Sequence, residues 1–281
     1  MSGSNGTRER PIGVFDSGVG GLTVMRAITE LLPDEDIVYL GDTARVPYGN
    51  RAPETVRRYA KNCADVLVER RIKALVIACN TASAHALDAV RESLAIPVIG
   101  VIDPVARTAA STSQTDTIAV IGTRGTVRSN SYPAALERLG SSARVIQRAC
   151  PLFVPLAEEG WTKGAVPEAV ARRYLESLAE TDVDTLILGC THYPLLHDTI
   201  AAVVSELTTR NVTLLDSAAS TARDLRDRLE SVGLCREPQA SRSLRFLLTD
   251  VPDRFETTAE RFFGQRISTF EHVDIIDHNS T

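Results

Sequence analysis

The chain of 281 residues is 43% hydrophobic and 24% charged, with a formal net charge of −5. These values are typical of a globular protein with one large domain or two of ordinary size. The acidic balance, without a block of Lys and Arg, argues against nucleic acid as a partner. No apolar run approaches the ~18 residues of a membrane span, and the first residues do not resemble a signal peptide. We therefore expect a cytoplasmic protein with reduced cysteines and no membrane partner.

Short apolar runs alternate with amphipathic stretches over the first hundred residues. The predicted strands cover residues 12–15, 37–40, 74–78 and 98–102. The predicted helices cover residues 22–32, 54–70 and 82–93. Because continuous runs of Leu, Val and Ile suit parallel strands that are buried on both faces, this alternation indicates a doubly wound α/β sheet.

The same order of elements starts again near residue 117. There, the apolar run 117–121 ends in a glycine-bearing turn, and a later run ends in Cys190. The turn that begins at Asp16 precedes Cys79 by 63 residues, and the turn at Thr123 precedes Cys190 by 67. We interpret this repeat as an internal duplication, which predicts two pseudo-symmetric, doubly wound lobes with mostly parallel sheets.

The two predicted lobes are not contiguous in sequence, because the apolar run after residue 211 is expected to return the chain to the first lobe. The Ser/Thr-rich stretch after Pro104 is the expected crossover between them. We predict a first lobe of residues 11–103 and 212–270, a second lobe of residues 104–211, and disordered tails at 1–10 and 271–281.

Cys79 and Cys190 each end an apolar run and are followed by small polar residues. The carboxyl ends of parallel strands are where open α/β sheets bind ligands, and a helix N-terminus favours a thiolate. Two such thiols can form a disulfide, bind a metal, or serve as acid/base groups on one substrate. A reducing compartment disfavours the disulfide, and the spacings to His85 and His192 do not match zinc pairs. Simple apolar packing is the remaining alternative, which suits Cys63 and Cys235.

Two turns and three titratable residues are weaker candidates. The turn Asp16-Ser-Gly-Val-Gly-Gly matches neither GxGxxG nor a P-loop, and its carboxylate suits an ammonium group better than a phosphate. Pro47-Tyr48-Gly49 offers backbone N–H groups and a phenol to a carboxylate. Both segments are equally compatible with ordinary turns, and Glu158, Glu159 and His192 are compatible with solvated surface positions.

Five segments, taken together and in order, resemble bacterial glutamate racemases of the aspartate/glutamate racemase superfamily. The resemblance covers residues 11–263. Thr191-His192 favours glutamate racemases, because the related aspartate racemases typically carry Thr-Glu at these positions. The segments are Asp16-Ser-Gly-Val-Gly-Gly, Pro47-Tyr48-Gly49, Cys79-Asn80-Thr81, residues 150–160 and Gly189-Cys190-Thr191-His192.

This resemblance implies a racemase that uses no cofactor and no metal, binds glutamate between two lobes, forms a homodimer and supplies D-glutamate for peptidoglycan. It implies that Cys79 deprotonates D-glutamate and Cys190 deprotonates L-glutamate. Asp16 would assist the first thiol and His192 the second, with Glu158 near the latter. The implied substrate-binding residues are Asp16, Ser17, Pro47, Tyr48, Gly49, Asn80, Thr81, Thr123, Thr126, Thr191 and His192.

The resemblance agrees with the chemistry that the residues suggest. The α-proton of an amino acid is weakly acidic, so without a cofactor, hydrogen bonds and charges must stabilise the carbanion. A racemase also needs a base on each face of its substrate, which a duplicated cysteine frame provides. The alternatives are an aspartate or hydantoin racemase, a decarboxylase that uses one thiol, and a non-catalytic amino-acid-binding protein.

Overall fold

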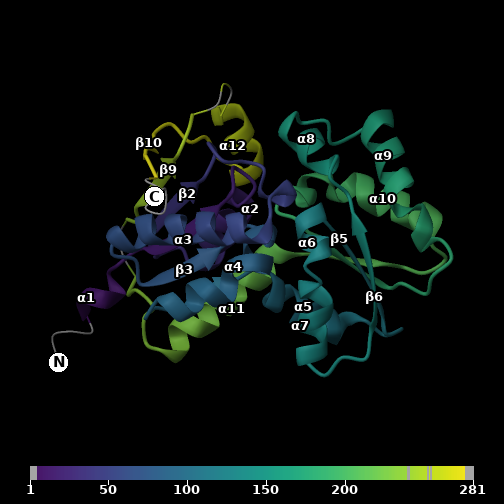
Figure 1. Cartoon of the computed structure of the whole chain (residues 1–281), viewed down its shortest axis with the longest axis horizontal. Coiled ribbons are helices and arrows are strands. Elements are labelled where there is room, and N and C mark those ends of the chain that lie inside the picture. Colours follow the sequence, from purple (N-terminus) through teal and green to yellow (C-terminus); the bar gives the residue numbers. More distant parts are fainter. Residues whose placement is uncertain (1–4, 239–240, 252, 254, 276–281) are drawn as a thin grey trace.

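The computed structural model describes residues 5–238, 241–251, 253 and 255–275. Within these residues, two parallel β-sheets lie in separate lobes, with helices packed around each (Figure 1). The six-stranded sheet has the order β10-β9-β2-β1-β3-β4, and the four-stranded sheet has the order β6-β5-β7-β8. The predicted α/β fold of two lobes with parallel sheets is confirmed.

The first sheet is built mainly from the apolar runs of the N-terminal part. Its strands are β1 (Ile12–Asp16), β2 (Ile37–Gly41), β3 (Ala74–Ile77), β4 (Val98–Gly100), β9 (Leu244–Leu248) and β10 (Glu271–His272). Every residue of β1, β2 and β3 is buried, because helices cover both faces. The covering helices are α2 (Leu22–Leu31), α11 (Ser217–Ser231) and α12 (Phe255–Phe263) on one face, and α3 (Pro53–Glu69) and α4 (Asn80–Ser93) on the other.

The second sheet is covered in the same way. Its strands are β5 (Thr117–Gly122), β6 (Arg144–Ala149), β7 (Thr185–Gly189) and β8 (Thr213–Asp216). Its helices are α5 (Ile102–Thr112) and α7 (Ser131–Arg138) on one face, and α8 (Phe153–Glu158), α9 (Ala165–Leu175) and α10 (His197–Leu207) on the other. The short elements are α1 (Asn5–Arg8), α6 (Arg124–Arg128), η1 (Tyr48–Asn50), η2 (Glu176–Leu178) and η3 (Tyr193–Leu196).

Residues 212–216 were predicted to belong to the first lobe. The strand β8, which they contain, lies instead in the second sheet. It pairs in parallel with β7, from Thr185 opposite Thr213 to Leu188 opposite Asp216, and α10 forms the crossover between the two strands. A short run of Thr and Leu does not indicate which of two parallel sheets it joins. The next helix, α11, packs against α2, so we propose that the second lobe extends to Asp216.

The Ser/Thr-rich crossover is helical as far as Thr112. Pro104 lies in the first turn of α5, where a missing N–H is tolerated, and the Ser/Thr-rich residues form the end of the helix. The Thr108 hydroxyl donates to the Pro104 carbonyl at 3.2 Å, and the Thr112 hydroxyl donates to the Thr108 carbonyl at 2.8 Å. These hydroxyl groups bond within the helix, which is why a stretch that reads as a loop can be helical.

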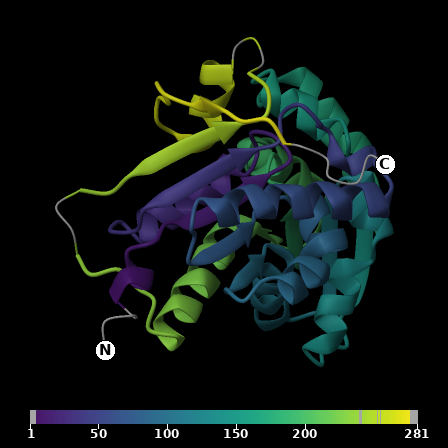
Figure 2. The ribbon, with the colours of Figure 1, turned by 60° about the vertical axis from the view of Figure 1, so that its left-hand side comes forward.

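Both expected tails contain regular structure where they are described. Residues Asn5–Arg8 form α1, and β10 pairs in parallel with β9; residues 1–4 and 276–281 lie outside the described residues. No element was predicted between residues 231 and 270, where β9 and α12 occur. Figure 2 shows β9, from the C-terminal part of the chain, lying beside β2 from the N-terminal part, with which it pairs.

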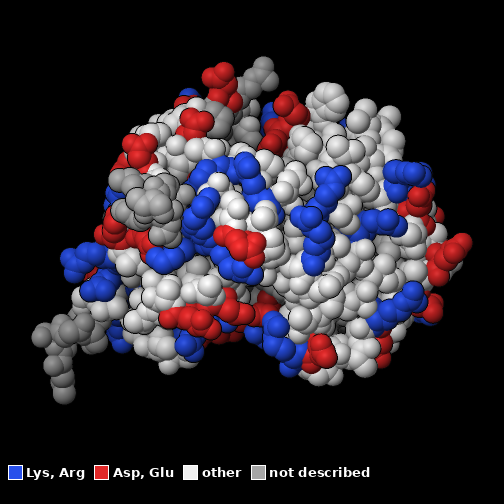
Figure 3. Space-filling model, viewed as in Figure 1, with Lys and Arg blue, Asp and Glu red and all other residues white. Residues whose placement is uncertain are grey.

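Charged side chains are distributed over the surface. On the face shown in Figure 3, acidic and basic side chains are interspersed among neutral ones. Many form exposed pairs, such as Arg107 Nη1 with Asp224 Oδ1 at 2.7 Å, and pairs of this kind stabilise a fold by about 0–1 kcal/mol each. Among the described helices, none is both long and apolar enough to cross a membrane.

Candidate active site

The carboxyl ends of the central strands of both sheets meet at one cavity. Cys79 follows β3 and Cys190 follows β7, and each thiol side chain belongs to a residue that is only 6% exposed. Both line a cavity of about 280 Å³. The other predicted residues that line it are Ser17, Pro47, Tyr48, Gly49, Asn80, Thr81, Thr123, Glu158, Thr191 and His192.

Two predicted residues lie behind this lining. Asp16 ends β1 directly before Ser17, and Thr126 is hydrogen-bonded to Thr81 and Thr123 in the wall. The cavity also contains residues that the sequence analysis did not select. They are Val46, Asn50, Arg124, Pro151, Val154 and Pro155. Each is adjacent to a selected residue or lies in the segment 150–160, so proximity to a motif is the only sequence signal that marks them.

Cys79 is held as a neutral thiol. It is the N-cap of α4, where its Sγ accepts a hydrogen bond from Ala82 N at 3.4 Å and donates one to Ser17 Oγ at 3.5 Å. Burial and the nearby Asp16 carboxylate raise the pKa of Cys79 to about 12, against the opposite effect of Ser17 and Ala82. The position at a helix N-terminus predicted a thiolate, but Cys79 is a thiol, because burial and a negative neighbour outweigh the effect of the helix.

Asp16 presents an unsatisfied oxygen. Its Oδ2 accepts a hydrogen bond from Gly18 N at 2.9 Å, whereas Oδ1 is buried and has no hydrogen-bond partner among the described residues. Burial raises the pKa of Asp16, although His192 and three backbone N–H groups act to lower it. A buried carboxylate oxygen without a donor is suited to accept a hydrogen bond from a ligand.

Cys190 is accompanied by a histidine and a carboxylate. His192 Nδ1 lies 3.9 Å from Cys190 Sγ, and His192 Nε2 lies 2.9 Å from Glu158 Oε1. Burial lowers the pKa of His192, but the contacts with Cys190 and Glu158 outweigh burial and raise it to about 10. The ring is therefore an imidazolium at neutral pH and places a positive charge beside the Cys190 sulfur.

A cluster of hydroxyl groups joins the two lobes. Thr81 Oγ1, from the first lobe, lies 2.9 Å from Thr123 Oγ1 and 3.3 Å from Thr126 Oγ1, both in the second. The loop before α3 also approaches closely, since a Cβ on Gly49 would lie 2.8 Å from Thr123 Cβ. Glycine is needed at this contact, and the hydroxyl groups form a polar patch that is suited to bind an anion.

The Tyr48 hydroxyl and the Asn80 Nδ2 group already have hydrogen-bond partners within the protein. Tyr48 donates its hydroxyl hydrogen bond to the carboxylate of Asp42, which also accepts from Arg45. Asn80 Nδ2 donates to Tyr132 OH at 2.9 Å and to Ser217 Oγ at 3.3 Å. The Asn80 Oδ1 atom is buried and has no partner among the described residues, so it is the second unsatisfied acceptor at this site.

A disulfide and a metal site were two other roles considered for the cysteines. All five cysteines are free thiols. His85 Nε2 lies 3.2 Å from the Gly125 carbonyl oxygen, and the residues that the structure describes contain no group of three or more His, Cys, Asp or Glu side chains placed to bind one metal ion.

Comparisons with known proteins match nearly the whole chain. Residues 12–225 match the family described as Asp/Glu/Hydantoin racemase. A glutamate racemase of Geobacter metallireducens is 49% identical over 266 residues, which are 95% of this chain and 97% of the relative. A glutamate racemase of Aquifex aeolicus is 45% identical over 91% of this chain and 95% of its own.

Solved structures give the same result. The glutamate racemase of Francisella tularensis in complex with D-glutamate has a TM-score of 0.89 and 37% identity, over 95% of this chain and 98% of that one. An aspartate racemase homologue from Pyrococcus horikoshii, with 18% identity and a TM-score of 0.56 over 79% of this chain and 99% of that one, shares the fold alone. The chain therefore belongs to the Asp/Glu/Hydantoin racemase family.

Proposed function

We propose that the chain interconverts L-glutamate and D-glutamate without a cofactor. The observation that carries this proposal is the pair of thiols, one from each lobe, that line a single cavity of about 280 Å³. The substrate is supported by relatives named glutamate racemase at 43–49% identity over more than nine tenths of this chain. An aspartate or hydantoin racemase is less well supported, because the aspartate racemase homologue of Pyrococcus horikoshii shares only the fold.

The unequal surroundings of the thiols support a direction for each. With L-glutamate, Cys190 acts as a thiolate and takes the α-proton, so a C–H bond breaks and an S–H bond forms. Cys79, which is a thiol at neutral pH, then donates its proton to the opposite face of the carbanion and becomes a thiolate. The imidazolium of His192 stabilises the negative charge on Cys190, and D-glutamate follows the reverse path.

The substrate's charged groups have matching partners. We place its ammonium group between the unsatisfied oxygens of Asp16 and Asn80. Its carboxylates suit the hydroxyl and backbone N–H groups around the cavity, and because the Tyr48 hydroxyl is bonded to Asp42, the loop backbone is the better donor there. The proposed carboxylate-binding residues are Ser17, Tyr48, Gly49, Thr81, Thr123, Thr126 and Thr191. Pro47 shapes the wall without offering a donor, and His192 and Glu158 lie at one end of the cavity.

The biological setting is also a proposal. We propose a homodimer that works in the cytoplasm, where thiols stay reduced, and that supplies D-glutamate for peptidoglycan. The resemblance to bacterial glutamate racemases supports all three statements. Sedimentation of the purified chain tests the first of them.

Incubation of the purified chain with L-glutamate in deuterated, pyridoxal-free buffer containing a chelator tests the reaction. We expect D-glutamate to form with deuterium at its α-carbon, and aspartate and hydantoins to react far more slowly. Binding of glutamate without exchange of the α-proton would support the non-catalytic alternative. Faster turnover of aspartate would support another racemase of the family.

A further inference from the structure

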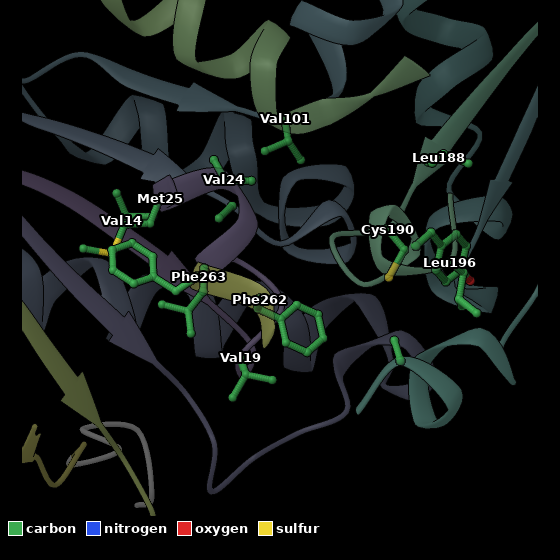
Figure 4. Packing of buried hydrophobic residues seen from close by; sticks show 14 of the residues in the cluster. Val14, Val19, Val24, Met25, Val101, Leu188, Cys190, Leu196, Phe262 and Phe263 are labelled. Atoms are coloured by element: carbon green, nitrogen blue, oxygen red, sulfur yellow. The ribbon is translucent and has the colours of Figure 1, made fainter. Parts of the chain in front are cut away.

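The helix α12 brings the consecutive side chains of Arg261 and Phe262 from the first lobe to the catalytic end of the second. It packs on α2 and lies beyond residues 12–225, which carry the family match. Figure 4 shows the Phe262 ring directed from α12 towards the part of the second lobe that holds Cys190, whereas Phe263 lies nearer to Val14 and Met25. Nothing in the sequence motifs assigns a role to this helix.

The Phe262 side chain contacts His192, and the Arg261 side chain contacts the backbone of Glu158. The Phe262 ring is 1% exposed and meets the His192 ring edge to face, with the ring centroids 4.9 Å apart at 71°. Arg261 Nη1 donates a hydrogen bond to the Glu158 carbonyl oxygen at 2.7 Å. A Cβ on Gly160 would lie 2.9 Å from the guanidinium carbon of Arg261, so the second lobe provides the space that this arginine fills.

Both nitrogens of the His192 ring have polar partners, Cys190 and Glu158. The orientation of the ring also depends on what packs against it. The charged and titratable groups around it are Cys190 at the end of β7, Glu158 on α8 and Asp16 at the end of β1, with Arg261 acting through Glu158. These groups act at the ring edges. Among the aromatic contacts of the described residues, Phe262 alone packs against the ring.

We propose that Phe262 is a positioning residue that holds the His192 ring with Nδ1 towards Cys190 and Nε2 towards Glu158. Proton transfer at Cys190 then depends on the docking of α12 across the two lobes. This inference rests on the proposed function of Cys190 and His192. A leucine at residue 262 would fill part of the same space but would pack less closely against the His192 ring, so the ring could tilt away from Cys190 and Glu158.

The test compares Phe262→Leu with Phe263→Leu. Phe263 is a matched control, because it lies on the same helix, is 4% exposed and packs edge to face on Phe246 at 5.6 Å, away from the site. At similar melting temperatures, we expect Phe262→Leu to lower kcat about 10-fold and Phe263→Leu less than about 3-fold. Phe262→Tyr keeps the ring and should retain most of the activity.

A second readout does not depend on turnover. In NMR spectra of the chain with labelled histidines, Phe262→Leu should lower the pKa of His192 by about one, because a tilted ring loses part of its contacts with Cys190 and Glu158. Phe263→Leu should leave this pKa unchanged. Equal kcat values for the two leucine variants, or an unchanged His192 titration in Phe262→Leu, would overturn the proposal. If wild-type chain does not racemise glutamate, the proposed function fails, and the titration still decides whether Phe262 holds the ring.

Discussion

The two halves of the site share a frame but differ in what surrounds the thiol. Cys79 contacts a hydroxyl and a backbone N–H group and lies near the carboxylate of Asp16, whereas Cys190 lies beside an imidazolium that is paired with Glu158. A negative neighbour favours the thiol and a positive neighbour favours the thiolate. A duplicated fold thus provides two equivalent positions, and unequal neighbours distinguish the two thiols, as a two-base reaction needs.

Loss of either thiol is the strongest way to break this comparison. We expect Cys79→Ser and Cys190→Ser each to lower kcat by at least about 10²–10⁴-fold, because a serine hydroxyl is too weakly acidic to replace a thiol in proton transfer. Cys235→Ser, at a half-buried cysteine away from the cavity, is the control and should be fully active. More than a tenth of wild-type activity in either site variant would contradict the two-thiol mechanism.

Removal of the neighbours tests whether the halves are specialised. His192→Asn should lower kcat about 10²-fold and should slow deuterium exchange from L-glutamate most, and Asp16→Asn should affect exchange from D-glutamate most. Because the equilibrium constant between enantiomers is one, kcat/KM must fall by the same factor in both directions. Exchange rates from both enantiomers, measured in deuterated buffer, separate the cases, and equal effects of the two variants would mean that the halves are interchangeable.

The charge on His192 also predicts a pH dependence of stability. The pKa of His192 rises from its ordinary 6.5 to about 10 on folding, so the folded chain holds this proton more tightly than the unfolded chain. The resulting stabilisation is fully present below about pH 6.5 and is lost as the pH rises through about 10. Urea unfolding should therefore show a stability difference between wild type and His192→Asn that shrinks over this range, and a constant difference would mean that the ring is neutral.

The contact between the lobes at Gly20 can be tested by adding one methyl group. A Cβ there would lie 2.3 Å from Thr191 Oγ1 and 2.4 Å from His192 Nδ1, so Gly20→Ala must displace the histidine or separate the lobes. We expect kcat to fall about 10-fold, which reflects a misplaced catalytic group. Gly6→Ala, where a Cβ would meet nothing within 4 Å, should change nothing; wild-type kinetics in Gly20→Ala would show that this packing is not required.

Much of this site could be predicted from the sequence, because polar residues after buried parallel strands must gather at one edge of a sheet. The state of Cys79 was not predictable, since it depends on burial and on Asp16, which is distant in sequence. The strand β8 was assigned to the wrong sheet for a similar reason: pairing with β7 is a long-range choice that local pattern does not encode. The contact of Phe262 with His192 joins residues 70 positions apart and has no local signal.

The smallest effect should come from the residues that orient Asn80. Tyr132 OH and Ser217 Oγ accept hydrogen bonds from Asn80 Nδ2 at 2.9 and 3.3 Å, which leaves Oδ1 as the atom available to a substrate ammonium group. Tyr132→Phe removes the shorter bond and allows the amide to turn, so we expect KM for both enantiomers to rise about 3- to 5-fold with kcat within about 2-fold of wild type. Unlike the two site-cysteine variants, this one keeps both thiols, so it should leave the balance of deuterium exchange between the enantiomers unchanged. Steady-state kinetics in both directions measure the effect, and a fall in kcat without a change in KM would mean that Asn80 acts on the carbanion and not on the bound ammonium group.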